Sequence, residues 1–118
     1  MGMDVYGTRE DTYFRNNVWF WRPLWNYVNE TCDLSDEDFN MGLENNGHFI
    51  SKKKSDEISE ILFEEVKSKR THDYMLSRNK RLKSLNRQHH SETNYGFDVN
   101  NVKTFAKFCK ESDGFEIC

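Results

Sequence analysis

The sequence predicts an all-α fold, a small single-domain bundle of about five or six helices. Three observations lead to this prediction. The most apolar stretch, residues 13–28, repeats its large side chains at helical spacing, and capping residues precede several later amphipathic segments. Strand-type alternation is hard to find. With 118 residues, of which 14% are aromatic, the chain can bury one modest core, so we expect a single domain over 1–118.

The aromatic stretch is expected to form the centre of this bundle. All three tryptophans lie in it, and one apolar stripe follows helical steps of four and three. The members of this stripe are Phe14, Val18, Trp21, Trp25 and Val28. Pro23, the only proline, lacks an N–H and clashes with the carbonyl four residues earlier. It therefore predicts a pair of helices, about 12–21 and another beginning at Pro23, with a single kinked helix as the alternative.

The flanking segments are assigned from capping residues and turns. Residues 1–11 are predicted to be an irregular lead-in to the aromatic helix pair. Ser35 is expected to cap a short helix, and Ser51 a longer one covering about 52–68. Two short segments are candidates for strands, residues 48–50 and 115–118.

The second half of the chain predicts two more helices separated by a loop. Thr71 is expected to cap a helix of about 72–85, and Asp98 a last helix of about 99–111. A polar loop is predicted at 86–96. The apolar stripe of the last helix includes Cys109, which we expect in the core.

Charge is distributed unevenly along the chain, whose net charge is −3. Residues 1–66 carry 6 basic and 14 acidic residues, whereas residues 67–90 carry 8 basic residues and 1 acidic residue. The basic segment could neutralise phosphates, so nucleic-acid binding is one alternative function. The side chains expected to carry it are Lys69, Arg70, Arg78, Lys80, Arg81, Lys83 and Arg87. The structural alternative is a solvated face that pairs with the acidic half.

The aromatic stretch also contains polar residues that predict a ligand- or partner-binding site. Arginine beside tryptophan can clamp a planar or phosphorylated ligand by stacking and paired hydrogen bonds, so a nucleotide-like small molecule is a further alternative ligand. The candidate residues are Arg15, Asn16, Asn17, Trp19, Arg22 and, at a helix entry, His48. The structural alternative is that the asparagines satisfy backbone groups and the arginines pair with acids.

Catalytic and metal-binding patterns are missing from the sequence. No GxSxG, HExxH, Walker or glycine-rich dinucleotide motif is present, so we predict no enzyme activity and no cofactor. The three cysteines include no CxxC pair, which argues against a zinc ribbon, so we predict no metal site. Without a signal-peptide pattern or a long apolar run, we expect a cytoplasmic location and no membrane partner.

Three pieces of the sequence carry a resemblance to other proteins: DVYG with YFRNNVWFWRPLW, GHFIS followed later by KRTHDY, and FDVNNVKTFAKFCKESDGFEIC. Together they resemble a group of short uncharacterised proteins of bacteriophages and bacteria that share the aromatic block and the GFEIC tail. Longer members carry a cysteine-rich insert where this chain has 86–96, without cysteine. The departure removes the one metal site that the resemblance could have implied.

The resemblance implies a phage or phage-like origin and, with it, the cytoplasm of a host cell. Acidic phage-type proteins of this size often occupy the surface of a host protein. We therefore expect a binding or interaction protein without catalytic activity whose partner is a host factor or a component of a defence system. The uneven charge also suits association into a homo-oligomer.

Overall fold

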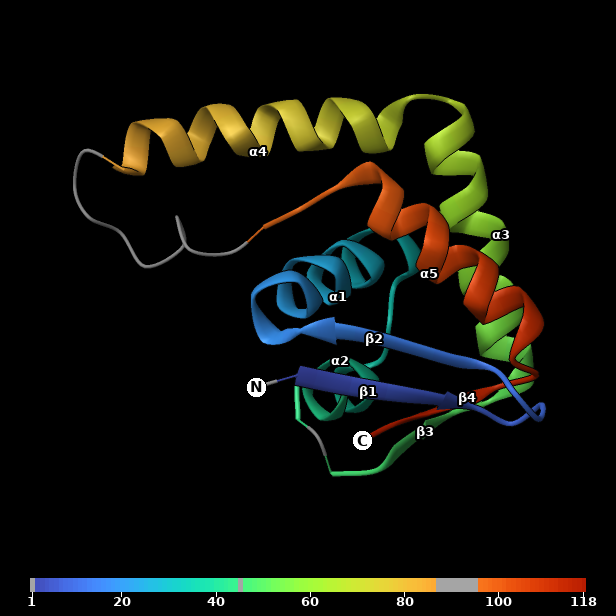
Figure 1. Cartoon of the computed structure of the whole chain (residues 1–118). Coiled ribbons are helices and arrows are strands. Elements are labelled where there is room, and N and C mark those ends of the chain that lie inside the picture. The colour runs from blue at the N-terminus through green and yellow to red at the C-terminus, as the bar shows by residue number, and fades with distance from the viewer. Residues whose placement is uncertain (1, 45, 87–95) are drawn as a thin grey trace.

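The structure, a computed structural model, describes residues 2–44, 46–86 and 96–118. In these residues the chain forms five helices and a four-stranded antiparallel sheet (Figure 1). The elements in chain order are β1 (Gly2–Gly7), β2 (Tyr13–Asn17), α1 (Val18–Cys32), α2 (Asp36–Gly42), β3 (His48–Ile50), α3 (Lys52–Lys67), α4 (Arg70–Asn86), α5 (Val99–Glu111) and β4 (Phe115–Ile117). The all-α prediction is therefore wrong, and the fold is mixed α and β. Of the predicted polar loop, residues 87–95 lie outside the described residues.

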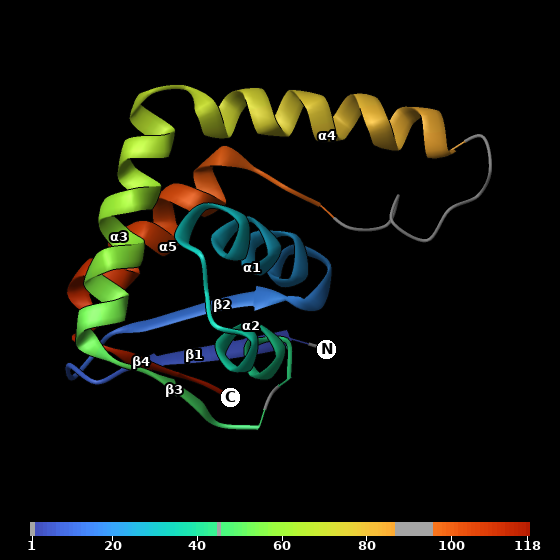
Figure 2. The ribbon, with the colours of Figure 1, turned by 180° about the vertical axis from the view of Figure 1, so that it is seen from behind.

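The sheet has the strand order β2-β1-β4-β3, which places the two ends of the chain side by side. Val5 lies opposite both Phe14 on β2 and Ile117 on β4, and Ile50 of β3 lies opposite Phe115. These five side chains are buried. The helices cover the face of the sheet that carries these buried side chains. For example, α2 lies in front of β1 in Figure 2 and behind the sheet in Figure 1. The sheet thus has one covered face and one open face.

Residues 13–17 form a strand because their side chains alternate and because a partner strand is available. Phe14 is buried between the exposed Tyr13 and Arg15, and β1 supplies the matching buried Val5. Five residues are compatible with either a helical or a strand period, so the pairing with β1 decides between them. The predicted irregular lead-in at 1–11 is wrong for the same reason.

Pro23 does not break the helix. α1 continues through it from Val18 to Cys32, so the predicted pair of helices is wrong and the alternative of one helix holds. Pro23 leaves the carbonyl of Trp19 without its usual helical donor. The backbone N–H of Gly96 donates to this carbonyl instead, at 2.8 Å. Gly96 can come this close because it lacks a side chain, since a Cβ there would lie 2.6 Å from the ring of Phe20.

The core is centred on the aromatic residues of α1, as predicted. The rings of Trp21 and Trp25 stack with centroids 5.3 Å apart, and the ring of Phe105 from α5 meets both edge-on. The indole N–H of Trp21 donates to the carbonyl of Gly42 at 2.7 Å. These contacts fix α2 and α5 against α1, and the buried Cys109 confirms its predicted place in the core.

The capping predictions have mixed outcomes. Ser35 and Ser51 cap α2 and α3, because each hydroxyl accepts a backbone N–H three residues later. Thr71 is not a cap: it lies inside α4, buried, with its hydroxyl 2.9 Å from the hydroxyl of Tyr27. Asp98 precedes α5, but its side chain makes no capping hydrogen bond.

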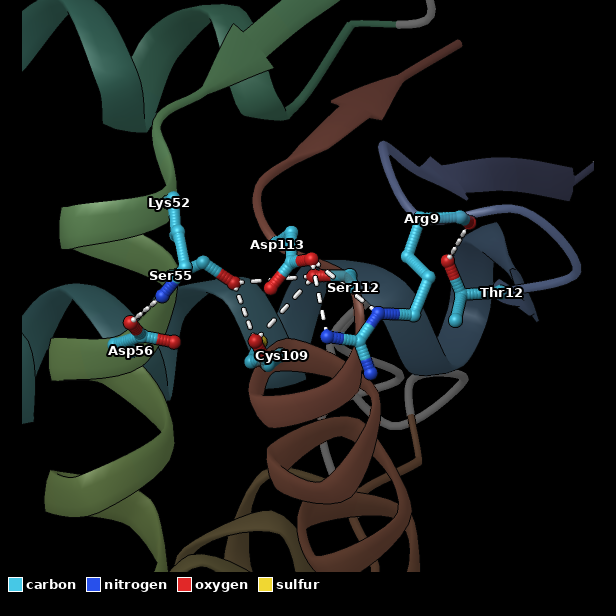
Figure 3. A network of polar contacts seen from close by, with 8 residues as sticks. All are labelled: Arg9, Thr12, Lys52, Ser55, Asp56, Cys109, Ser112 and Asp113. Atoms are coloured by element: carbon cyan, nitrogen blue, oxygen red, sulfur yellow. Dashed lines mark hydrogen bonds and ion pairs between the residues drawn. The ribbon is translucent and has the colours of Figure 1, made fainter.

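A seam of small hydroxyl side chains joins α3 to α5 and to the end of the sheet (Figure 3). Ser55 donates to the carbonyl of Cys109 at 2.6 Å and lies 3.2 Å from the hydroxyl of Ser112. Nearby, Arg9 from the turn between β1 and β2 forms a 3.1 Å ion pair with Asp113. The seam therefore ties both ends of the chain to one helix pair.

Candidate functional site

The open face of the sheet carries a row of large side chains, one from each strand. The register aligns Tyr13 of β2 with Tyr6 of β1, Tyr6 with Glu116 of β4, and Glu116 with Phe49 of β3. The three aromatic residues are about half exposed: Tyr13 by 51%, Tyr6 by 50% and Phe49 by 55%. Figure 1 shows no helix in front of these strands. We call these four residues the outer-face row. Exposed aromatic side chains gathered in one patch are typical of an interaction site.

The two tyrosines at one end of the outer-face row are held in place by a polar network. Their rings lie 5.2 Å apart, and the Tyr13 hydroxyl donates to the Asp4 carboxylate at 2.5 Å. Arg15 donates to the same oxygen at 2.7 Å. The hydrogen bond from Tyr13, followed by that from Arg15, lowers the pKa of Asp4, and the bond to Asp4 raises the pKa of the Tyr13 phenol. Asp4 therefore stays ionised, and the guanidinium of Arg15 balances its charge.

Glu116 lies between Tyr6 and Phe49 in the outer-face row, and its carboxylate, unlike that of Asp4, is not paired with a cation among the described residues. Within the described part of the chain its carboxylate forms no ion pair, and it accepts a hydrogen bond from the Cys118 thiol at 3.0 Å. This hydrogen bond is the main cause that raises the pKa of Cys118 to about 11. The ring of Phe49 leans over Gly114, two residues before Glu116 on the same face, where a Cβ would lie 3.3 Å from the Phe49 ring. Gly114 also has a φ of +96°, which favours glycine.

Paired residues on neighbouring strands lie about 5 Å apart. Tyr6 and Phe49 therefore lie on either side of Glu116, about 10 Å from each other across the sheet. A cation at the Glu116 carboxylate would gain an ion pair, and contact with a neighbouring aromatic ring would add about 0.5–2 kcal/mol. The arrangement can bind an arginine or lysine side chain.

The structure does not bring the predicted ligand residues of the aromatic stretch together. Arg15 pairs with Asp4 on the open face. Asn16 exchanges two side-chain hydrogen bonds with Asn101 of α5, at 2.8 and 3.0 Å. Asn17 caps α1 by accepting the N–H of Phe20. The structural alternative therefore describes these three residues well.

The other predicted ligand residues are also separated. Trp19 is 45% exposed at the start of α1. Arg22 is exposed and lines a hollow of about 320 Å³ that also contains Glu44 and Asn46. His48 faces the covered side of the sheet, where its Nε2 lies 2.8 Å from the carboxylate of Asp38 in α2.

The predicted basic segment mostly belongs to α4, which extends beyond the rest of the molecule in Figure 1. Arg70 forms an ion pair with Glu65. Arg78 is only 8% exposed, so it does not belong to the exposed basic surface that was predicted. The remaining described members, all exposed, are Lys69, Lys80, Arg81 and Lys83. Arg87 lies outside the described residues.

The residues that the structure describes form neither a cluster of metal-binding type nor a membrane-spanning helix. No three His, Cys, Asp or Glu side chains gather as they would around a metal ion. No described helix is both long and apolar enough to cross a membrane.

Comparisons with known proteins do not assign the chain to a family. No known family model matches the chain, and neither the curated proteins nor the solved structures contain a significant match. The site must therefore be interpreted from its own geometry.

The sequence interpretation missed Tyr6, Phe49 and Glu116. A weak signal was present, since each residue stands next to an apolar residue that is buried in the structure, as in Val5-Tyr6, Phe49-Ile50 and Phe115-Glu116-Ile117. Short alternating segments of this kind can be recognised as strands only when their partners are known.

Proposed function

We propose that this chain is a small binding protein without catalytic activity, and that it holds a protein partner on the open face of its sheet. The observation that carries the proposal is the exposed aromatic patch of the outer-face row with the unpaired Glu116 carboxylate within it. Leaving three large aromatic side chains in water adds little to folding, so a role in recognition accounts for them.

The chemistry of the outer-face row favours a partner that presents an arginine or lysine. Its cationic head would lie over Glu116, and its alkyl stem would pack between Tyr6 and Phe49. The resemblance to phage-type proteins supports a host protein as this partner, such as a host factor or a defence-system component, met in the host cytoplasm.

Site-specific photo-crosslinking in host cells tests this proposal. A benzoylphenylalanine placed at Phe49 is expected to crosslink one protein, through a peptide that contains arginine or lysine. The matched control is the same group at Phe63, which is 39% exposed on α3 and should give no such product. Glu116→Lys should weaken the crosslinked complex by at least about tenfold, or about 1.4 kcal/mol, because it places two cations together.

Three results would contradict the proposal. They are no product from position 49, equal products from positions 49 and 63, or a complex that Glu116→Lys leaves intact. Because Glu116 is exposed on the sheet surface, its substitution should not change folding, and a melting curve checks this point.

A further inference from the structure

A second surface lies where α3, α4 and α5 meet, on a different part of the molecule from the outer-face row (Figures 1 and 2). It is a groove of about 570 Å³ between the end of α3, the start of α4 and the start of α5. Val66 and Met75 form part of its apolar floor. We call it the junction groove.

Three lysines and one histidine from four different segments converge on the junction groove. They are Lys67 of α3, Lys69 of the turn between α3 and α4, His72 of α4 and Lys103 of α5. None of these four forms an ion pair among the described residues, unlike the neighbouring Arg70, which is paired with Glu65. One carboxylate, that of Asp98, also lines the groove, so the three lysines leave an excess of positive charge. Unpaired cations from separate elements around one groove favour an anionic ligand.

The backbone at Lys69 has a defined conformation at the edge of the groove. Lys69 adopts a left-handed φ of 72°. Its N–H donates to the carbonyl of Val66, and its own carbonyl accepts the N–H of Asp73. On the opposite wall, α5 begins without a side-chain capping bond from Asp98. The amino end of α5 therefore adds its positive dipole to the lysines.

The positive surface continues from the groove along α4. His72, Leu76, Lys80 and Lys83 follow one helical stripe in steps of four, four and three, and all are exposed. The 17 residues of α4 extend about 25 Å. This length matches several successive phosphates of a nucleic-acid strand, which are spaced by about 3.4 Å along a duplex axis.

We propose that the junction groove binds backbone phosphates of a nucleic-acid strand, with Lys67, Lys69 and Lys103 as direct contacts and the exposed stripe of α4 guiding the rest of the strand. Contacts of this type go to the backbone and carry no sequence preference. The groove and the outer-face row share no residue, so the two proposals can fail separately.

Fluorescence anisotropy with labelled 20-nucleotide single-stranded and duplex probes, at salt concentrations from 50 to 200 mM, tests the proposal. The double variant Lys69→Gly and Lys103→Ala should weaken binding about tenfold at low salt. It should also reduce the salt slope by about 0.7 for each lost contact to a single strand. Lys69→Gly relieves the left-handed backbone conformation, so the melting temperature should stay equal to or rise above that of the wild type. A loss of binding then cannot be attributed to unfolding.

The control variant Lys53→Ala and Lys110→Ala removes the same charge from exposed sites that do not line the groove and should retain both affinity and slope. The proposal is overturned if the wild type binds neither probe at 50 mM salt, or if the control weakens binding as much as the groove variant. Displacement of the probe by inorganic triphosphate at equal phosphate concentration would also overturn it, because the ligand would then be a small polyphosphate.

Discussion

The outer-face row and the junction groove are built differently and favour opposite charges. The row lies on four paired strands, combines three aromatic residues with one carboxylate, and holds them at the fixed spacing of a sheet. The groove forms where three helices meet and carries lysines from separate segments. A chain of net charge −3 can thus separate its charges into an acidic, aromatic surface and a basic surface. A row fixed by strand pairing suits recognition of a particular side chain, whereas lysines, which act as point charges on long stems, suit repeating phosphates.

The largest expected effect comes from the core that supports both surfaces. Phe105 of α5 is fully buried and contacts Phe14, Trp21 and Phe115. Phe105→Ala should lower the free energy of unfolding by about 3–5 kcal/mol, because it removes a large buried ring and leaves a cavity. Urea denaturation measures the change.

The contrasting variant is Phe49→Ala in the outer-face row. Because Phe49 is mostly exposed, its loss should change the free energy of unfolding by less than about 1 kcal/mol. A cost as large as that of Phe105→Ala would mean that the exposed aromatic residues serve folding rather than binding.

A smaller effect is expected at the seam that joins the helices of the groove to the sheet. Ser55→Ala removes the buried hydrogen bond to Cys109 and should cost about 1 kcal/mol of unfolding free energy. Ser68→Ala is the matched control, since Ser68 is exposed at the end of α3, and it should change stability by less than about 0.5 kcal/mol. Equal effects in the two variants would mean that the buried hydrogen bond of Ser55 adds no stability.

The smallest effect concerns the charge within the outer-face row and can be observed through Cys118. Its thiol pKa of about 11 keeps it protonated at pH 8, because the Glu116 carboxylate accepts its hydrogen bond and opposes the thiolate. Glu116→Gln should lower this pKa and raise the alkylation rate at pH 8 by about tenfold for each unit of pKa. Folding stability should not change.

Iodoacetamide labelling followed by mass spectrometry measures this rate, and it reports Cys118 because Cys32 and Cys109 are buried. Glu37→Gln, a change at an exposed position on α2, is the control and should leave the rate unchanged. An unchanged rate in Glu116→Gln would show that the Glu116 carboxylate does not contact the Cys118 thiol.

The features that depend on near neighbours could be predicted from the amino-acid sequence. The serine caps of α2 and α3, the buried tryptophans of α1 and the apolar stripe of α5 are all local patterns, since a cap acts over three residues and a helical stripe over one or two turns. For the same reason the predicted bounds of α5 agree with the structure.

The sheet, the course of α1 and the composition of the candidate site depend on contacts between distant parts of the chain. β1 pairs with β4 more than 100 residues away, and Pro23 is accommodated because Gly96 satisfies the carbonyl that it leaves free. Glu116 meets Tyr6 and Phe49 for the same reason. Strand pairing is a contact between distant segments, and a run of three to six residues does not contain the information about which partner it will meet.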